Sequence, residues 1–152
     1  MKSTAAMPVT EAQGSIDDQL AALRSDFHLY APQCLKIKTK AGHLLPFKLN
    51  KAQMYIDFKL NEQLEKTGKV RALILKGRQQ GCSTYVGGRF YHKASLRFGT
   101  SVYILTHEQK ATENLFAMAE RYHEHTPLQP KLGKSNAKEM QFVKLDGGYK
   151  VG

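Results

Sequence analysis

The segment from Val70 to Thr84 constrains the fold of this chain more strongly than any other part of the sequence. It reads V-R-A-L-I-L-K-G-R-Q-Q-G-C-S-T, so an apolar run leads into two glycines and two hydroxyl residues. The run Ala72–Leu75 predicts a buried strand, Gly77 and Gly81 predict a tight loop, and the residues that follow predict a helix. Such a unit can bind phosphate, because backbone N–H groups turn toward the anion and the helix N-terminus adds partial positive charge.

The loop departs from the standard phosphate-binding pattern, G-x-x-x-x-G-K-[ST], at two positions. Lys76 stands where that pattern has its first glycine, and Cys82 stands where it has its lysine. The hydroxyl that would hold Mg²⁺ is kept, at Ser83 or Thr84. The alternative interpretation is an ordinary strand-to-helix turn whose glycines are present for steric reasons.

The loop K-G-R-Q-Q-G-C-S-T resembles the deviant Walker A loop of the large terminase subunits of tailed bacteriophages and prophages. In that family the segment commonly reads R-Q-x-G, then a variable residue, then serine or threonine, with an arginine inside the loop. The positions of this chain that match are Arg78, Gln79, Gly81 and Ser83.

Three further segments resemble the same family, in the same order along the chain. Phe47–Gln53 is similar to the adenine-side segment, Val102–Phe116 to the second strand and its helix, and Ser135–Gly152 to the hairpin before the acidic Walker B strand. The resemblance covers about residues 35–152. It implies the α/β fold of a P-loop NTPase, a RecA/ASCE-like three-layer sandwich with a parallel sheet, truncated before Walker B.

The resemblance also implies a function. The chain would be the N-terminal ATPase portion of a terminase large subunit, the ATP-driven motor that packages viral DNA into proheads. The full protein would also carry a nuclease. Its cofactors would be ATP and Mg²⁺, and its partners double-stranded DNA, the terminase small subunit and the portal protein, in the cytoplasm of a bacterial host.

The site residues follow from the matched positions. Arg78 is expected to face phosphate and to act in catalysis, although it could instead point to solvent or pair with a carboxylate. Gln53 could read the adenine edge, or it could simply cap the helix that it begins. Ser83 is the expected Mg²⁺ ligand. The expected nucleotide-binding residues are Gln53, Lys76, Gly77, Arg78, Gln79, Gln80, Gly81, Cys82, Ser83 and Thr84.

ATP hydrolysis needs an acidic residue at the end of a later strand, and the sequence does not supply one. No apolar strand ending in Asp-Glu follows Ser83, and Asp57, Glu62 and Glu65 are expected on the solvated face of a helix before the loop. The 152-residue chain is therefore expected to be inactive by itself. Two alternatives stay open: a helicase-like nucleic-acid translocase, which would usually keep the loop lysine, or a non-catalytic prophage remnant that binds anions or DNA.

Composition narrows the class of partner. The chain carries 23 Lys+Arg against 13 Asp+Glu, a formal charge of +10, which favours a polyanion. No apolar run of about 18 residues predicts a membrane span. The two cysteines, Cys34 and Cys82, form no metal-binding pattern, so a reducing compartment is the simplest assumption.

The order of elements predicts an α/β chain with a parallel sheet. Residues 1–14 are expected to be a disordered tail, residues 15–69 a helix, a hairpin and the adenine-side helix, and residues 70–152 the incomplete first part of an ATPase core. The expected helices begin near residues 15, 50, 84 and 106. The expected strands are 35–39, 43–47, 70–75, 101–105, 139–145 and 149–151.

Overall fold

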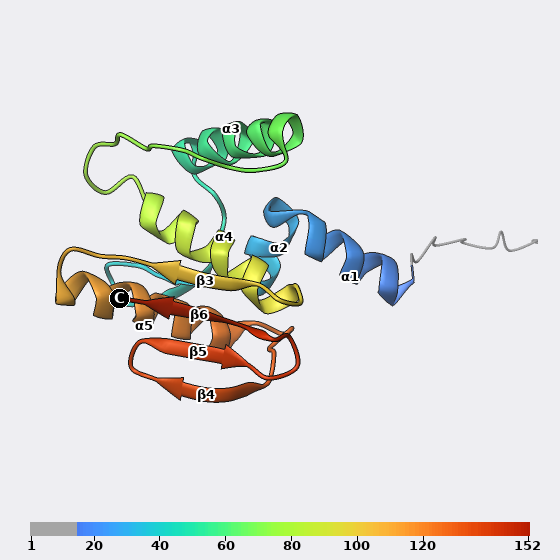
Figure 1. Ribbon diagram of the computed structural model, residues 1–152. Helices are drawn as coiled ribbons and strands as arrows, with labels where there is room; N and C mark the ends of the chain where they lie inside the picture. The colour runs from blue at the N-terminus through green and yellow to red at the C-terminus, as the bar shows by residue number, and fades with distance from the viewer. Residues whose placement is uncertain (1–14) are drawn as a thin grey trace, which may run out of the picture.

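The computed structural model describes residues 15–152 and contains five helices and two small sheets in that range (Figure 1). The predicted disordered tail, residues 1–14, lies outside the described residues. In chain order the elements are α1 (Ile16–Ser25), α2 (Phe27–Cys34), β1 (Lys36–Lys38), β2 (Leu44–Pro46), α3 (Lys51–Thr67), α4 (Cys82–Leu96), β3 (Ser101–Ile104), α5 (Gln109–His125), β4 (Leu132–Asn136), β5 (Glu139–Phe142) and β6 (Gly147–Val151).

Side-chain caps fix the start of the two N-terminal helices that the sequence predicts. Ser15 and Asp18 form a capping box at α1, and Asn50 and Gln53 form one at α3. Each box satisfies backbone N–H groups that have no partner inside the helix. Gly68 ends α3 in the left-handed conformation (φ 69°), which glycine adopts without steric cost. These boundaries are confirmed to within one residue.

The two sheets are small and mostly antiparallel. Strands β1 and β2 form the expected hairpin. The second sheet has the order β3-β6-β5-β4, in which only β3 and β6 run parallel. The predicted parallel sheet of a P-loop NTPase is therefore wrong for residues 15–152: the larger sheet is mixed, and β3 is one of its two edge strands.

The predicted strand over residues 70–75 is also wrong. This segment is extended but pairs with no strand within residues 15–152, and the side chains of Leu73 and Leu75 are fully exposed. The carboxamide of Gln63 holds its start by accepting from the N–H of Arg71 (2.8 Å) and donating to the carbonyl of the same residue (3.0 Å). An apolar run becomes a strand only where a neighbouring strand satisfies its backbone groups, and no described strand lies beside this run.

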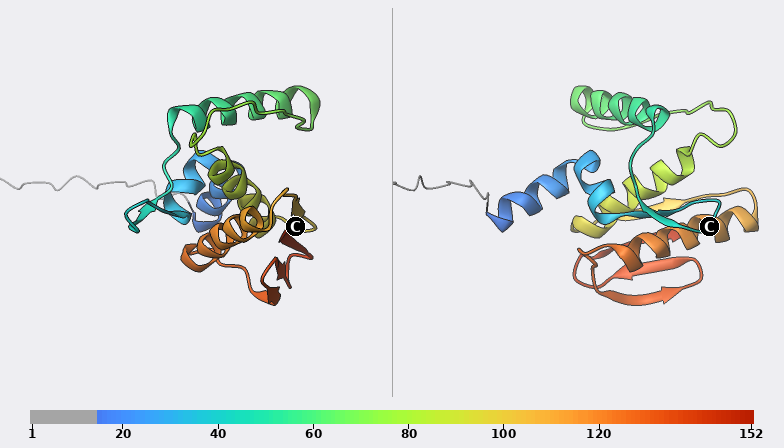
Figure 2. Two further views of the ribbon diagram at one scale, coloured as in Figure 1. Left: turned by 90° about the vertical axis from the view of Figure 1, so that its left-hand side faces the viewer. Right: turned by 180° about the vertical axis from the view of Figure 1, so that it is seen from behind.

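The three-layer sandwich is likewise wrong, because helices cover only one face of the four-stranded sheet. Met140, Phe142 and Tyr149 point to the covered face and are buried, whereas Tyr103 and Gln141 lie on the other face and are exposed. Figure 2 shows α4 and α5 on the covered side of the sheet. The open face carries a hollow of about 770 Å³.

The core is largely aromatic and surrounds α4. Tyr85 and Tyr91 of α4 are fully buried, as is Tyr122 of α5. The glycine pair inside α4, Gly87 and Gly88, permits close packing: a Cβ on Gly88 would approach the ring of Phe47 to 3.0 Å. The hairpin and α2 therefore lie directly against α4, which is the central element of the fold.

Candidate phosphate-binding loop

The loop from Lys76 to Gln80 connects the extended segment to α4 and is exposed throughout. Two of its residues have left-handed backbone conformations, Gln79 (φ 61°) and Gly81 (φ 71°). Gly81 is the N-cap of α4 and makes no side-chain capping bond. Within residues 15–152, the backbone N–H groups from Gly77 to Thr84 have no hydrogen-bond acceptor. The loop therefore presents a row of free donors at the positive end of a helix.

The first turn of α3 holds this loop in place. The side-chain amide of Gln53 donates to the carbonyl of Gly81 (2.8 Å), and that of Asn50 donates to the carbonyl of Gln80 (3.3 Å). Gln53 is buried, and its carboxamide oxygen accepts from the N–H of Asn50 (2.9 Å). The capping role proposed for Gln53 is thus observed. Both the oxygen and the nitrogen of its carboxamide take part in hydrogen bonds within the protein.

The close contact between α3 and the loop explains one glycine. A Cβ at position 81 would lie 2.7 Å from the Nε2 atom of Gln53, which is shorter than any normal contact. A side chain there would also carry the cost of the left-handed conformation. Gly81 is therefore required both by its backbone angle and by the neighbouring amide.

Several basic side chains lie in or beside the loop and form no ion pair within the described residues. Lys76 and Arg78 are exposed, and neither has an ion pair within the described part of the chain. Lys40, in the turn between β1 and β2, donates to the side-chain oxygen of Gln79 (3.1 Å). Of the three possibilities for Arg78, pairing with a carboxylate is not seen among these residues.

The first turn of α4 divides its side chains between core and solvent. Cys82 is buried at 5% exposure, and it lines the two hollows beside the loop. Ser83 is exposed, and its hydroxyl is the one that a ligand at the loop could reach. Thr84 is half-buried, and its carbonyl accepts from the hydroxyl of Tyr122 on α5 (3.1 Å). The helix that points at the loop is thus anchored from a second side.

Two hollows flank the loop. One, of about 480 Å³, lies between α3 and the extended segment, and the other, of about 230 Å³, lies between Ile74 of that segment and Ile104 of β3. Ser83 lines the smaller hollow, together with Lys76. No Asp or Glu lines either one. A bound Mg²⁺ would find one protein hydroxyl there, while the carboxylate that usually accompanies it is not among the lining residues.

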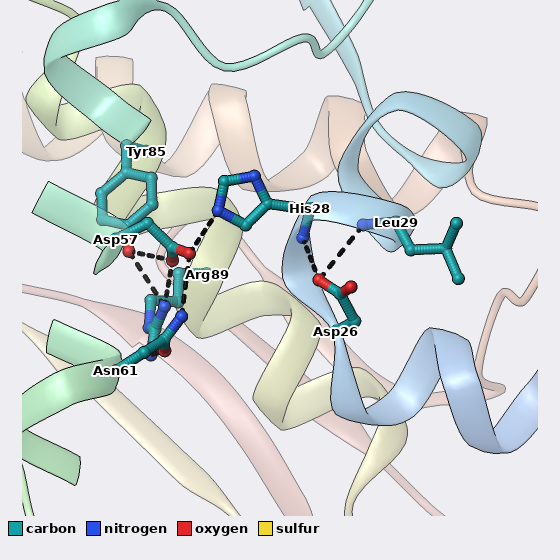
Figure 3. A network of polar contacts seen from close by, with 7 residues as sticks. All are labelled: Asp26, His28, Leu29, Asp57, Asn61, Tyr85 and Arg89. Carbon is teal, nitrogen blue, oxygen red and sulfur yellow. Dashed lines mark hydrogen bonds and ion pairs between the residues drawn. The ribbon is translucent and has the colours of Figure 1, made fainter. Parts of the chain in front are cut away.

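A buried polar network lies on the same two helices (Figure 3). Asp57 of α3 is fully buried; one of its oxygens accepts from the hydroxyl of Tyr85 (2.5 Å) and from Arg89, and the other accepts from Asn61 (2.9 Å) and faces Nε2 of His28 (2.6 Å). Arg89 also donates to the carboxamide oxygen of Asn61 (2.6 Å). Burial raises the pKa of Tyr85 well above its usual range, and the bond to Asp57 adds to this shift.

The network corrects the prediction that Asp57 lies on a solvated helix face. Gln53 and Asp57 are one turn apart and are the buried residues of α3, so its inward face carries polar side chains. The four-residue spacing of Ala52, Ile56 and Leu60 predicted that the apolar face of α3 would be the buried one, which placed Asp57 on the solvent side. One sequence feature could have indicated a buried carboxylate. Arg89 directly follows Gly87 and Gly88 in α4, where close packing leaves an arginine in need of a buried partner. The network joins α2, α3 and α4, and so it holds the helix that carries Gln53 against the helix that begins at Gly81.

Two histidines on the long helices are buried, His92 on α4 and His123 on α5. His92 contacts the carbonyl of Leu23 (2.7 Å), and His123 contacts the hydroxyl of Tyr91 (3.0 Å). Burial lowers the pKa of both. Within residues 15–152, no group of three or more His, Cys, Asp or Glu side chains is arranged to hold a metal ion.

No protein-family model matches the chain, and a comparison with curated proteins finds no match either. The terminase resemblance therefore depends on the residues of the chain itself. None of the helices described in residues 15–152 has the length and apolar character needed to cross a membrane.

Proposed function

We propose that the loop from Lys76 to Thr84 binds the phosphates of ATP, and that the chain is the N-terminal ATPase portion of a DNA-packaging terminase large subunit. Phosphate binding by the loop does not require a parallel sheet, because the donors are backbone N–H groups of the loop and of the first turn of α4. The observation that carries it is the run of backbone N–H groups from Gly77 to Thr84, which are free of acceptors and lead into the uncapped start of α4. Phosphate oxygens are the natural acceptors for such a row.

The charges around the loop support the same ligand. Lys76, Arg78 and Lys40 lie at or beside it, and the standard loop lysine is replaced by the buried Cys82. Arg78 is the cation within the loop itself, and a guanidinium pairs well with phosphate because two parallel N–H bonds can form. Ser83 would supply the protein hydroxyl for Mg²⁺, while ATP and water would supply most of its other oxygens.

A non-catalytic anion-binding role is the second candidate. It is favoured by the absence of Asp and Glu from the lining of both hollows beside the loop. Phosphoryl transfer needs an acidic group to hold the metal and to orient water. In this alternative the loop would bind phosphate without turnover.

Calorimetric titration of the 152-residue chain with ATP and Mg²⁺ tests the proposal. Arg78→Ala should weaken ATP binding about tenfold or more, because a charge-assisted hydrogen bond contributes about 1.5–3 kcal/mol. Arg71→Ala is the matched control, since Arg71 is an exposed arginine on the same segment that lies before the loop. Cys82→Ala should leave affinity nearly unchanged, because the buried thiol is only a weak hydrogen-bond donor.

Either of two outcomes would contradict the loop assignment. The first is an equal loss of ATP affinity in Arg78→Ala and Arg71→Ala, which would indicate a diffuse charge effect. The second is loss of affinity in Cys82→Ala while Arg78→Ala binds like the parent chain. Dependence of the ATP affinity on Mg²⁺ that disappears in Ser83→Ala would support the metal ligand.

A further inference from the structure

A further hollow, of about 380 Å³, is lined by residues of α3, of the C-terminal half of α4 and of the junction between α1 and α2. Figure 1 shows where these elements lie. Arg89, Lys93 and Arg97 line it. These residues follow one another at four-residue intervals, so Arg89 and Lys93 lie on one face of α4, and Arg97, the residue that ends the helix, continues the row. Asn61 and His92 complete the part of the wall next to the buried network.

The cations of this hollow are not neutralised equally. Arg89 forms the floor and is paired with the buried Asp57. Neither Lys93 nor Arg97 has an ion pair or a side-chain hydrogen bond in the described range. Burial lowers the pKa of Lys93, and the positive charges of Arg89 and Arg97 lower it further. An ammonium group held among guanidinium groups is a binding position for an anion.

Two carboxylates, Asp26 and Glu65, also line the hollow. Asp26 is engaged at the start of α2, where one oxygen accepts from the N–H groups of His28 (2.8 Å) and Leu29 (3.4 Å) (Figure 3). Glu65 is exposed. His92 contacts the carbonyl of Leu23 through Nε2, and its lowered pKa keeps the ring neutral at pH 7. Among the described residues, Lys93 and Arg97 therefore carry the unpaired positive charges of the hollow, and Asp26 and Glu65 carry unpaired negative charges on the same wall.

We infer that this hollow is a second anion site and binds a phosphate group through Lys93 and Arg97, with Arg89 adding positive charge at its floor. Lys93 acts as a point charge, whereas the guanidinium of Arg97 can donate two parallel bonds to phosphate oxygens. The loop lies at the N-terminus of α4 and this hollow at its C-terminal half. The inference is therefore independent of the proposed ATP site. A nucleic-acid backbone and a free phosphate compound share the recognised chemistry.

The test is an NMR titration of the isotope-labelled 152-residue chain with inorganic phosphate at constant ionic strength. The side-chain signals of Lys93 and Arg97 should shift and reach saturation. In Lys93→Gln/Arg97→Gln the saturable shifts at Asn61 and His92 should disappear. Lys134→Gln/Lys138→Gln is the matched control, because it removes two exposed cations at the same sequence spacing from another surface.

A second arm identifies the source of the phosphate. Fluorescence anisotropy with a labelled DNA duplex should give a loss of affinity of about tenfold for Lys93→Gln/Arg97→Gln, beyond any loss in the control, if the group belongs to a nucleic-acid backbone. Equal affinities of the two double variants, with saturable phosphate shifts retained in the parent chain, would assign the site to a small phosphate compound.

Helix C-termini also favour cations, so the two residues could serve only to stabilise α4. That role lowers the melting temperature of the double variant but gives no saturable phosphate shift in the parent chain, and this result would overturn the inference. Shifts confined to residues 77–84 would overturn it as well, while leaving the loop proposal intact. The parent titration needs no substitution, so the inference stays testable even if the double variant does not fold.

Discussion

The side-chain amide of Gln53 lies 2.8 Å from the carbonyl oxygen of Gly81, so the first turn of α3 holds the residue from which α4 begins. The same side chain closes the capping box of α3 through the N–H of Asn50. One carboxamide therefore links the starts of two helices, through residues that are 28 positions apart in the sequence.

Gly81→Ala should destabilise the chain more than Gly99→Ala. Both glycines have similar left-handed angles, with φ of 71° and 66°, so both variants carry a backbone cost of about 1–2 kcal/mol. Only at position 81 does the added Cβ meet another group, the amide of Gln53, while position 99 has nothing within 4 Å. Urea unfolding of the two variants measures the difference. Equal losses of stability would show that the contact with Gln53 is not a constraint.

Asp57→Leu should cost about 3–5 kcal/mol of unfolding free energy, because it leaves the buried guanidinium of Arg89 without its carboxylate. The double variant Asp57→Leu/Arg89→Met should recover part of that loss, since no uncompensated charge stays in the core. Glu62→Gln, which removes a partly exposed carboxylate that pairs with Lys59 and Lys66 on the same helix, serves as the control and should change stability far less. A double variant no more stable than Asp57→Leu would contradict this account.

The caps and the loop were predictable from the sequence because their signals are local. The capping pairs, Gly68 and the glycine loop each act within a few residues, and each lies where the pattern indicates. The strand at residues 70–75 was not predictable in the same way. Its side chains do alternate, since Leu73 and Leu75 are fully exposed while Val70, Ala72 and Ile74 line the hollow beside α4, but a strand also requires a neighbour.

The missed parts of the structure depend on long-range contacts or on weak local signals. Helix α2 contains Pro32, which predicts a break, yet the side chain of Asp26 caps its start and tertiary packing buries Tyr30. The burial of Asp57 depends on Arg89, 32 residues away. No local pattern reports such a pairing, so a charged side chain on a helix was interpreted as solvated.

Stability should fall as the pH is lowered below about 6.5, with His92 contributing. Burial, and then the charges of Arg97, Arg89 and Lys93, lower the pKa of His92 from its ordinary value of 6.5. Just below pH 6.5, His92 therefore binds a proton in the unfolded chain but stays neutral in the folded chain. The contribution is complete above pH 6.5 and is lost as the pH falls through the lower, folded pKa.

Thermal melting between pH 7.5 and pH 5 checks this prediction. His92→Gln keeps a donor for the carbonyl of Leu23 and should flatten the dependence on pH. The exposed His125, on α5, gives the control His125→Gln, whose profile should follow that of the parent chain. An unchanged slope in His92→Gln would assign the acid sensitivity to other groups.

The 152-residue chain should release phosphate from ATP no faster than the uncatalysed background, even where it binds the nucleotide. Hydrolysis needs a carboxylate near the metal and the attacking water, and neither hollow beside the loop is lined by one. Asp57, the buried carboxylate of α3, is already occupied by Arg89, Tyr85, Asn61 and His28. A steady-state phosphate-release assay with and without Mg²⁺ is the measurement, with Ser83→Ala as the comparison. Turnover that requires Mg²⁺ and disappears in Ser83→Ala would mean that a catalytic carboxylate reaches the loop from within the chain. In that case the loop would have to close further onto α3 than it does here.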